Sequence, residues 1–493
     1  MYDVVHEADT VVVGAGAAGC VLAARLSEDP ARRVVLIEAG PHYPTLDQLP
    51  EDLRDGWRSA GSHDWSFRDE ATGAAVARAR VVGGCSATNG AIALRGTVRD
   101  FDGWAARGNP GWSYAEVLPA FRKLEDDHDF VDRWHGQGGP LPIRRYCAKE
   151  LTAVNAAAYE AAAQAGFPEV ADHNRPGTTG LGHAPVNTIG GVRISAALTY
   201  LAQARSRPNL VLLANALVDR VLMNNRRAVG VLLVDGRIVR ADRVVLAAGT
   251  YGSPALLLRS GIGPADGLRA LGIGVRADLP GVGANLQEHP GVSVIWPLGR
   301  AQPDGPRFQV VATWRSGSDE EADHDMQHVP AGAPQLFWVS ASVMTPRSRG
   351  TVKLASADPA VAPRIRLNLL HDPLDLARMI EGVRSARRIG ARKPLADLAS
   401  GPEQWAGAGI EDDGELANAV KAAVWPYHHA AGTCAMGPSP AAGAVVDATG
   451  SVHGVEALAV ADASIMPVIP AANIHLTTLM IAERIAELLS SSP

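Results

Sequence analysis

Three glycines near the N-terminus have the spacing of a dinucleotide-binding turn. Residues 14–19 read Gly-Ala-Gly-Ala-Ala-Gly and follow an apolar run at residues 10–13. In such a turn the first glycine allows a tight bend, the second lets a pyrophosphate approach the main chain, and the third lets the following helix pack on the strand. Glu38 lies 19 residues after Gly19, where a carboxylate can bind the hydroxyl groups of an adenosine ribose. The motif predicts a bound dinucleotide and does not distinguish a flavin from a nicotinamide.

Three histidines near the C-terminus could transfer protons. His428 and His429 precede the sequence Ala-Ala-Gly-Thr-Cys, and His475 lies among small and polar residues at 470–478. An unperturbed imidazole has a pKa of about 6.5, so it can accept a proton near neutral pH. Adjacent residues of a strand point to opposite sides, so His428 and His429 are not expected to face the same site. A buried histidine without a chemical role is the alternative for each of them.

Length and composition describe a large protein with no signs of nucleic-acid binding. The chain has 493 residues, and 46 Lys and Arg against 52 Asp and Glu give a formal charge of -6. The length predicts about two domains, and the mild acidity argues against a nucleic-acid partner. The four cysteines lack the spacing of zinc ligands, so free thiols are expected. Pro467 and Pro470 interrupt the stretch most similar to a membrane span, residues 463–482, so no transmembrane span is expected.

The order of apolar runs predicts an α/β fold. Residues 10–13 and 33–38 have the pattern of buried strands, and the chain between them has that of a turn and helix. Residues 210–234 predict two further strands separated at Asn224 and Asn225, and residues 243–248 predict a buried strand that returns to the first sheet.

Helix signals occur in two further places. Ser113-Tyr-Ala-Glu116 forms a capping box, which predicts a helix that runs to about residue 125. The C-terminal segment, residues 458–489, predicts a short strand, a proline-rich turn and an amphipathic helix.

Two long segments resemble the signatures of the glucose–methanol–choline (GMC) oxidoreductase family. Residues 78–90 resemble the first signature, and residues 249–263 match the second at every defined position. Further similar segments follow in the family's order, at residues 108–125, 281–290, 346–350 and 429–437. The resemblance extends from residue 9 to the C-terminus and points to the choline-dehydrogenase-like, alcohol-oxidising branch. It implies an α/β fold in which a Rossmann-like FAD-binding domain carries a second, α+β substrate-binding domain.

This fold implies that the two domains alternate along the chain. The FAD-binding domain is expected to comprise residues 1–145, 191–296 and 425–493, the last part with the reacting histidines. The substrate domain is expected to comprise residues 146–190 and 297–424.

The resemblance selects FAD as the dinucleotide. In similar proteins the residues that match Asp462 and Ala463 contact the ribityl or pyrophosphate part of FAD, and the residue that matches Val218 touches the adenine. The glycines of the first signature would let the main chain lie against a flat ring. The residues expected to bind FAD are Gly14, Gly16, Ala17, Ala18, Gly19, Glu38, Val82, Gly83, Gly84, Asn89, Gly90, Val218, Asp462, Ala463, Asn473 and His475.

The resemblance also implies that His429 and His475 are the catalytic pair. One imidazole would accept the hydroxyl proton of an alcohol while a hydride passes to flavin N5, which gives an aldehyde or ketone. Choline-oxidising relatives carry asparagine at the position of His475, which weakens an assignment to choline. The alternative is the non-redox chemistry of hydroxynitrile lyases, which share this FAD scaffold. A light-dependent decarboxylase is disfavoured because such proteins lack the histidine pair.

The expected partners are a small alcohol and an electron acceptor, which could be O2, a quinone or a redox carrier. The sequence names neither the alcohol nor the acceptor, and it does not give the oligomeric state. His324 and His328 have the spacing of metal ligands on a helix but match a strand in similar proteins, so no metal is expected. Too few residues precede the first apolar run for a secretory signal. The cytoplasm is therefore the expected location, with peripheral attachment to a membrane left open.

FAD is predicted to bind without a covalent bond. Some family members attach it through a histidine directly before the asparagine of the first signature, whereas this chain has Thr88 before Asn89. The purified protein should be yellow and should release intact FAD into the supernatant after acid precipitation. Flavin absorbance that stays with the precipitate would contradict this expectation.

Overall fold

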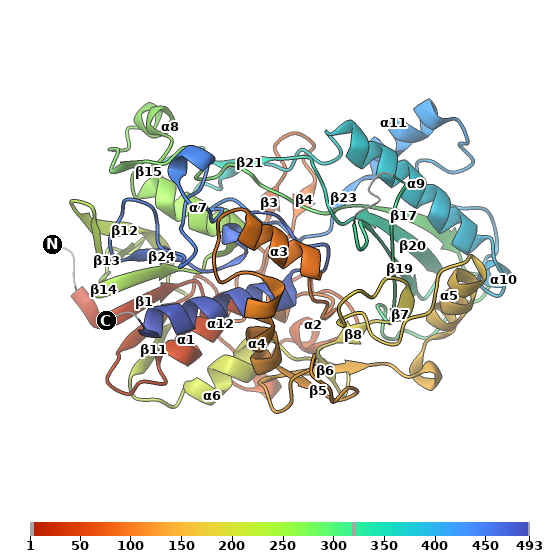
Figure 1. The fold of residues 1–493 in the computed structure, drawn as a ribbon, viewed down its shortest axis with the longest axis horizontal. Helices are drawn as coiled ribbons and strands as arrows, with labels where there is room; N and C mark the ends of the chain where they lie inside the picture. Colours follow the sequence, from red (N-terminus) through yellow and green to blue (C-terminus); the bar gives the residue numbers. More distant parts are fainter. Residues whose placement is uncertain (1–3, 318–321, 492–493) are drawn as a thin grey trace.

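Two large β-sheets organise the chain in the computed structural model, which describes residues 4–317 and 322–491 (Figure 1). The first sheet has seven strands in the order β11-β2-β1-β14-β13-β12, with β24 paired to β14. Its strands are β1 (Val4–Val13), β2 (Val34–Ile37), β11 (Leu210–Leu213), β12 (Val218–Asn224), β13 (Arg227–Leu233), β14 (Ile238–Leu246) and β24 (Leu458–Val460). Strands from three distant parts of the chain therefore form one sheet, as the sequence predicts.

The first sheet differs from the prediction in one place, since residues 210–234 form three strands where two are predicted. The chain bends between β11 and β12 at Asn215, whose φ of 53° is left-handed. The main chain there bonds to the end of β2, because Asn215 N donates to Gly40 O and Ala216 N donates to Glu38 O. This bend brings the start of β12 next to Glu38.

Helices α1 (Ala17–Leu26) and α12 (His475–Ser491) pack against each other on the first sheet (Figure 1). The buried carboxylate of Glu483 on α12 accepts hydrogen bonds from Arg25 on α1, at 2.8 to 3.0 Å, and from Tyr200 at 2.8 Å. The predicted capping box of Ser113 and Glu116 begins α4 (Tyr114–Leu124), which confirms that helix.

The second sheet has six antiparallel strands in the order β23-β17-β20-β19-β18-β7. They are β7 (Leu181–His183), β17 (Pro290–Pro297), β18 (Val310–Trp314), β19 (Met326–Ala333), β20 (Leu336–Val343) and β23 (Trp425–Pro426). Helices α5 (Ala153–Gln164), α9 (Pro373–Gly390) and α11 (Asp413–Ala423) pack beside it (Figure 1). Strand β17 and edge strand β23 include residues on the FAD side of the domain boundaries predicted at 297 and 425.

The remaining helices and strands lie outside the two large sheets. They are α2 (Glu51–Arg54), β3 (Phe67–Arg68), β4 (Ala75–Val76), α3 (Val98–Ala106), β5 (Glu125–Asp127), β6 (Leu141–Arg145), β8 (Pro185–Val186), β9 (Thr188–Ile189), β10 (Val192–Arg193), α6 (Ala202–Ala204), α7 (Gly249–Arg259), β15 (Ile262–Gly263), α8 (Ala265–Ala270), β16 (Ala277–Asp278), β21 (Thr351–Lys353), β22 (Arg364–Arg366) and α10 (Leu395–Leu398). Among the described residues, none of the helices combines the length and the apolar character that crossing a membrane requires.

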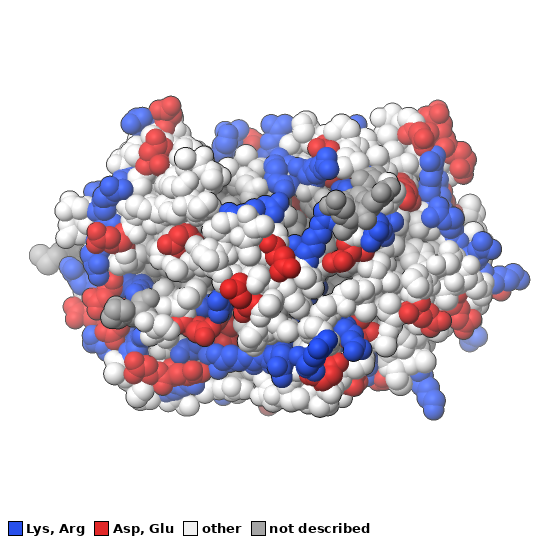
Figure 2. Space-filling view, in the orientation of Figure 1, with Lys and Arg blue, Asp and Glu red and all other residues white. Residues whose placement is uncertain are grey.

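Charged side chains of both signs are mixed over the face shown in Figure 2, with one row of basic side chains across its lower part. Mixed charge of this kind produces only a weak long-range field.

Arg144 and Arg145 are adjacent in the sequence but lie in different environments. Arg144 pairs with Glu150 near the surface, but Arg145 is buried. Its guanidinium lies 2.7 Å from Asp127 Oδ1 and 3.0 Å from Asp172 Oδ1. The carboxylates that compensate the charge of Arg145 come from other segments, so the local sequence gave no sign of its burial.

His135 lies in the same buried cluster. Its Nδ1 is 3.0 Å from Asp127 Oδ2, and its Nε2 is 2.9 Å from Asp172 Oδ2. Burial would lower the pKa of His135, but hydrogen bonds to Asp127, Asp172 and Glu125 outweigh it and raise this pKa to about 10. Glu125, Asp127 and His135 could together hold a metal ion, but Arg145 and Arg95 already neutralise the carboxylates, so we interpret the cluster as a network of ion pairs.

The two histidines with metal-like spacing do not share a site. His328 lies on β19 and its Nδ1 bonds to Ser340 O, whereas His324 Nε2 bonds to Ala471 O. The helical spacing does not apply there, because His324 lies in a loop and His328 in a strand.

Protonated His135 should make the folded state sensitive to alkaline pH. Because the pKa of His135 is higher in the folded chain than the unfolded value of 6.5, its contribution to stability is complete below pH 6.5 and is lost as pH rises toward 10. At about 1.4 kcal/mol per pKa unit the loss is at most ~5 kcal/mol. Thermal melts of the wild type should therefore show a falling Tm between pH 7 and 10. The variant His135→Gln should be less stable at pH 7 and show a flatter profile, and parallel profiles would contradict a protonated His135.

Candidate active site

The glycine turn after β1 has the geometry that its sequence predicts. Gly14 has a φ of 98°, and a Cβ there would lie 2.5 Å from Ala247 O. A Cβ on Gly19 would lie 1.8 Å from Gly14 O, so the start of α1 can pack here only as glycine. A Cβ on Gly16 would approach nothing nearer than Gly84 Cα at 3.9 Å. The main chain at the second glycine is thus open toward a ligand.

Glu38 directly follows β2 and is 7% exposed. Its carboxylate accepts hydrogen bonds from Ala15 N at 3.0 Å and Gly40 N at 2.9 Å. Burial raises the pKa of Glu38 to about 7, although these two hydrogen bonds lower it. Each oxygen keeps a second lone pair that a ribose hydroxyl could use. Val218, at the start of β12, follows the bend that bonds to Glu38 O through Ala216 N.

The first signature lies directly on the glycine turn. Gly83 N donates to Ala15 O at 2.7 Å, and a Cβ on Gly84 would lie 2.6 Å from Gly16 Cα. Gly83 and Gly84 both have positive φ, 100° and 52°. Two motifs that are distant in the sequence are therefore in main-chain contact.

The remaining residues expected in this loop have contacts of their own. Val82 is buried, and Asn89 Oδ1 accepts a hydrogen bond from Ala91 N at 3.0 Å. A Cβ on Gly90 would lie 2.8 Å from the Phe308 ring, so this glycine makes room for a side chain of the protein. Contact between these glycines and a flat ring stays a prediction.

Asp462 lies at the carboxyl end of β24 and is buried. It accepts hydrogen bonds from Gly249 N at 2.8 Å, Ser253 Oγ at 2.6 Å and Ser464 N at 2.8 Å. Burial raises its pKa, and the bonds from Ser253 and Ser464 oppose the shift. The buried Ala463 follows it in the chain. Asp462 thus joins β24 to α7, which carries the second signature, and its contact with FAD stays a prediction.

The imidazole of His429 is held on both of its nitrogen atoms. Its Nδ1 lies 3.0 Å from His289 Nδ1, and its Nε2 lies 3.3 Å from Asn473 Nδ2. The ring of Tyr427 stacks on it at 4.2 Å. The main-chain N of His429 donates to Glu288 Oε1 at 2.6 Å, and the same oxygen accepts from His289 N at 3.0 Å.

Two of the buried polar atoms that lack a partner in the described structure belong to the segment of Asn473 and His475. They are Asn473 Oδ1 and His475 Nε2, the latter on the first residue of α12. Burial lowers the pKa of His475 to about 4, so its imidazole is neutral at neutral pH. Unpaired buried polar atoms cost free energy unless a ligand completes them.

His428 is exposed, and its φ of 68° is left-handed. Arg78 Nη1 donates to its carbonyl oxygen at 2.8 Å. Strand β23 ends at Pro426, so the two adjacent histidines lie beyond the strand. The different environments of His428 and His429 therefore arise from a left-handed residue, whereas the sequence argument assumed the alternation of a strand.

The loop before α12 is fixed at successive main-chain groups. Trp104 Nε1 donates to Val468 O at 2.8 Å, and Gln287 Oε1 accepts from Ile469 N at 3.1 Å. Ala471 N donates to Asp100 Oδ2 at 3.0 Å, and Ala471 O pairs with His324 Nε2 at 2.8 Å. These bonds hold the chain that presents Asn473 and His475.

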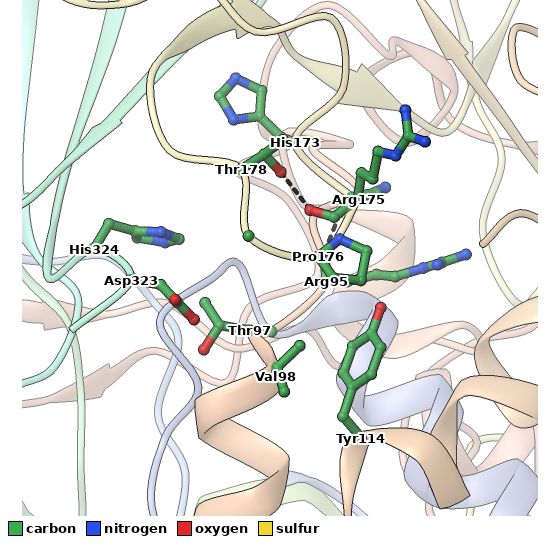
Figure 3. A pocket seen from close by; sticks show the side chains of 13 residues that line it. Arg95, Thr97, Val98, Tyr114, His173, Arg175, Pro176, Thr178, Asp323 and His324 are labelled. Atoms are coloured by element: carbon green, nitrogen blue, oxygen red, sulfur yellow. Dashed lines mark hydrogen bonds between the residues drawn. The ribbon is translucent and has the colours of Figure 1, made fainter. Parts of the chain in front are cut away.

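A cavity of about 20 Å³ is lined in part by His324 (Figure 3). Figure 3 shows His324 and Asp323 on one side of it and Arg95 and Tyr114 on the other. A space of this size holds about one water molecule, so it is distinct from a site for an alcohol.

His289 and Glu288, which orient His429, are not among the site residues that the sequence predicts. Both lie in a segment that resembles the family, residues 281–290, but their side chains offered no spacing to the C-terminal histidines. The buried His289 is 140 residues from His429, so only the fold reveals their contact.

These residues fit FAD. The open main chain at Gly16 and the free lone pairs of Glu38 suit a pyrophosphate and a ribose, and the unpaired atoms of Asn473 and His475 suit polar groups beside His429.

Comparisons with known proteins agree with this arrangement. The N-terminal and C-terminal family models of GMC oxidoreductases match residues 8–291 and 346–482. The chain is 39% identical to a 5-(hydroxymethyl)furfural oxidase of Methylovorus, over 97% of this chain and 98% of the relative. It is 35% identical to an oxygen-dependent choline dehydrogenase of Burkholderia pseudomallei, over 98% and 93% of the two chains.

The solved structure of a pyridoxine 4-oxidase from Mesorbium loti has a TM-score of 0.91 to this chain, with 33% identity over 99% of this chain and all of the other. The predicted fold class is therefore confirmed, and these relatives give no support to the lyase alternative. The chain belongs to the GMC oxidoreductase family, and it is an FAD-dependent alcohol oxidoreductase.

Proposed function

We propose that this protein oxidises a small alcohol to an aldehyde or ketone, with His429 as the base and His475 as its partner on the substrate oxygen. The arrangement of hydrogen bonds around the His429 ring is the observation that carries the proposal. Bound FAD supplies the acceptor for the hydride that leaves the alcohol carbon.

The hydrogen bonds assign one tautomer to His429. Asn473 Nδ2 can only donate, so His429 Nε2 accepts and carries no proton. The proton of the neutral ring then lies on Nδ1, which donates to His289 Nδ1. The lone pair of Nε2 therefore points toward Asn473, and it can accept the hydroxyl proton of a substrate that takes the place of the Asn473 amide at this nitrogen.

Burial keeps this base neutral before the reaction. It lowers the pKa of His429 well below its ordinary value, and the neighbouring His289 and Arg78 lower it further. His475 is neutral for the same reason, so its ring can donate or accept one hydrogen bond at the substrate oxygen. A neutral pair can hold the alcohol without first losing a proton, and proton uptake by His429 leaves an alkoxide from which the hydride departs.

The substrate that we propose is an alcohol on a small unsaturated ring. The stacked Tyr427 forms an aromatic wall beside His429, and its hydroxyl is fixed by a 3.0 Å hydrogen bond to Gln327. The named substrate of the Methylovorus relative is a hydroxymethyl group on a furan. His475 in place of asparagine still argues against choline.

For the acceptor we propose O2, with a quinone or a redox carrier as the alternatives. Two relatives are named as oxidases and a third as oxygen-dependent. We retain the cytoplasm as the location, because the four cysteines are free thiols. Stopped-flow mixing of reduced enzyme with O2, and separately with a quinone, would identify the acceptor.

Substitution of the two histidines tests the proposed roles. His429→Ala should slow anaerobic flavin reduction by an alcohol at least about 10²-fold, because a general base typically contributes 10²- to 10⁴-fold. His475→Ala should also slow it, and the double variant should lose far less than the product of the two factors because both rings act on one oxygen. Stopped-flow absorbance of the flavin, with FAD content checked for each variant, measures these effects.

His428→Asn is the matched control, since asparagine tolerates the left-handed backbone at this position. Its rate should stay close to that of the wild type. A slow His428→Asn with a nearly normal His429→Ala would transfer the role of base to His428, and a flavin that no alcohol reduces would contradict the proposed oxidation.

A further inference from the structure

Arg193, the last residue of β10, is a buried cation whose hydrogen bonds all go to the main chain. Its side chain is 1% exposed. Asp55, an acid within electrostatic range, uses its own carboxylate on Trp57 N and on Arg58 Nε. The charge of Arg193 is thus compensated by carbonyl groups.

Six carbonyl oxygens accept hydrogen bonds from this one guanidinium. Nε donates to Asn89 O at 2.7 Å. Nη1 donates to Ala87 O at 2.7 Å, to Leu53 O at 2.9 Å and to Asp52 O at 3.1 Å. Nη2 donates to Asp55 O at 2.5 Å and to Arg58 O. A guanidinium has five N–H groups. All five are in use, so none remains for a phosphate or a flavin.

Burial lowers the pKa of Arg193 to about 10, and the charges of Asp55 and Asp52 oppose this shift. The side chain stays charged at neutral pH. A buried charge of this kind is costly unless its donors are satisfied. The six carbonyl groups therefore determine where Arg193 can lie, and Arg193 determines where they can lie.

The acceptors belong to two segments that Arg193 holds together. One is residues 52–58, and the other is residues 87–89 of the first signature. The carbonyl of Thr88, between those of Ala87 and Asn89, accepts a hydrogen bond at 2.8 Å from Ala60 N, two residues after the first segment. Three consecutive carbonyls of the signature are thus fixed by groups outside it.

The other end of the signature rests on the glycine turn. The short 3-10 turn Gly84–Ala87 leads into residues 88 and 89, and Gly84 at its start contacts Gly16. The signature is therefore held in two places, by the glycine turn at Gly83 and Gly84 and by Arg193 at Ala87 and Asn89.

We propose that Arg193 is a positioning residue for FAD binding. It fixes the main chain of the first signature through its carbonyl groups and does not itself touch the cofactor. Loss of the guanidinium should make the main chain of residues 52–58 and 87–89 more mobile and so weaken FAD binding. The inference depends on FAD binding and is independent of the alcohol that is oxidised.

The test compares Arg193→Lys and Arg193→Met with the control Arg387→Lys. Arg387 on α9 also binds main-chain oxygens, at Gly407 and Ile410, together with Glu403, and it lies on the helix beside the second sheet. Titration of each apoprotein with FAD, followed by flavin fluorescence, gives the Kd. Hydrogen exchange of the apoproteins reports on residues 52–60 and 83–90.

Both Arg193 variants should raise the Kd for FAD at least tenfold and speed hydrogen exchange in both segments. Lysine at position 193 should not restore the wild-type Kd, because one ammonium group with three N–H bonds cannot bind all six carbonyls. Arg387→Lys should lower the Tm and leave the Kd unchanged. Glu38→Ala removes an expected ribose contact and a hydrogen bond to Ala15 N, so it should raise the Kd, but exchange in residues 52–60 should stay at the wild-type rate.

Several results would overturn the proposal. One is a wild-type Kd in Arg193→Lys, and another is a rise in Kd of equal size in Arg387→Lys, which would indicate general destabilisation. If Arg193→Met does not fold, Arg193→Lys alone decides, since it keeps the charge. Unchanged exchange at residues 83–90 in Arg193→Lys would show that the signature does not depend on the guanidinium.

Discussion

The main chain of the first signature approaches the glycine turn so closely that no side chain fits between them. Gly84 lies against Gly16, and Gly83 bonds to Ala15. Position 84 must be glycine for this contact, because a Cβ there would lie 2.6 Å from Gly16 Cα. Both segments must also be held rigidly if the space for a cofactor is to have one shape. The rest of the fold supplies that rigidity: Glu38 bonds to the same turn from β2, Asp462 fixes the start of α7, and Arg193 fixes the far end of the signature.

The catalytic histidines depend on a second set of contacts. The main-chain N–H of His429 donates a hydrogen bond to Glu288, and its ring is hydrogen-bonded to His289 and Asn473. Since both ring nitrogens are engaged, the tautomer follows from the partners and does not need a charged orienting group. The loop before α12 is fixed by Gln287, so the segment that contains Glu288 and His289 orients both parts of the site.

The sequence predicts much of this protein because its motifs are local. The glycine turn, Glu38 and the capping box of α4 each occupy a few consecutive residues, and the structure has them where the sequence predicts. The family and the fold class follow from the two signatures and are confirmed. The domain boundaries and the cofactor contacts of single residues stay predictions.

The features that the sequence does not predict come from contacts across the chain. The side chains of Arg193 and His289 meet partners 104 and 140 residues away, and Arg145 meets acids 18 and 27 residues away. Arg145 looks solvated in the sequence because its immediate neighbour is another arginine. The bend at Asn215, which adds a strand to the predicted pair, requires bonds to the end of β2. None of these partners leaves a spacing pattern.

Arg145 and Arg193 show two ways to bury a cation, with different consequences. Arg145 pairs with the carboxylates of Asp127 and Asp172, whose side chains can rotate and whose charge can be neutralised by protons. Such a cluster stabilises the fold and responds to pH through His135. Arg193 pairs with carbonyl groups, which do not titrate and cannot move without the main chain. A guanidinium held in this way specifies backbone positions, and backbone positions are what a loop needs when it must present its amide groups and glycines to a cofactor.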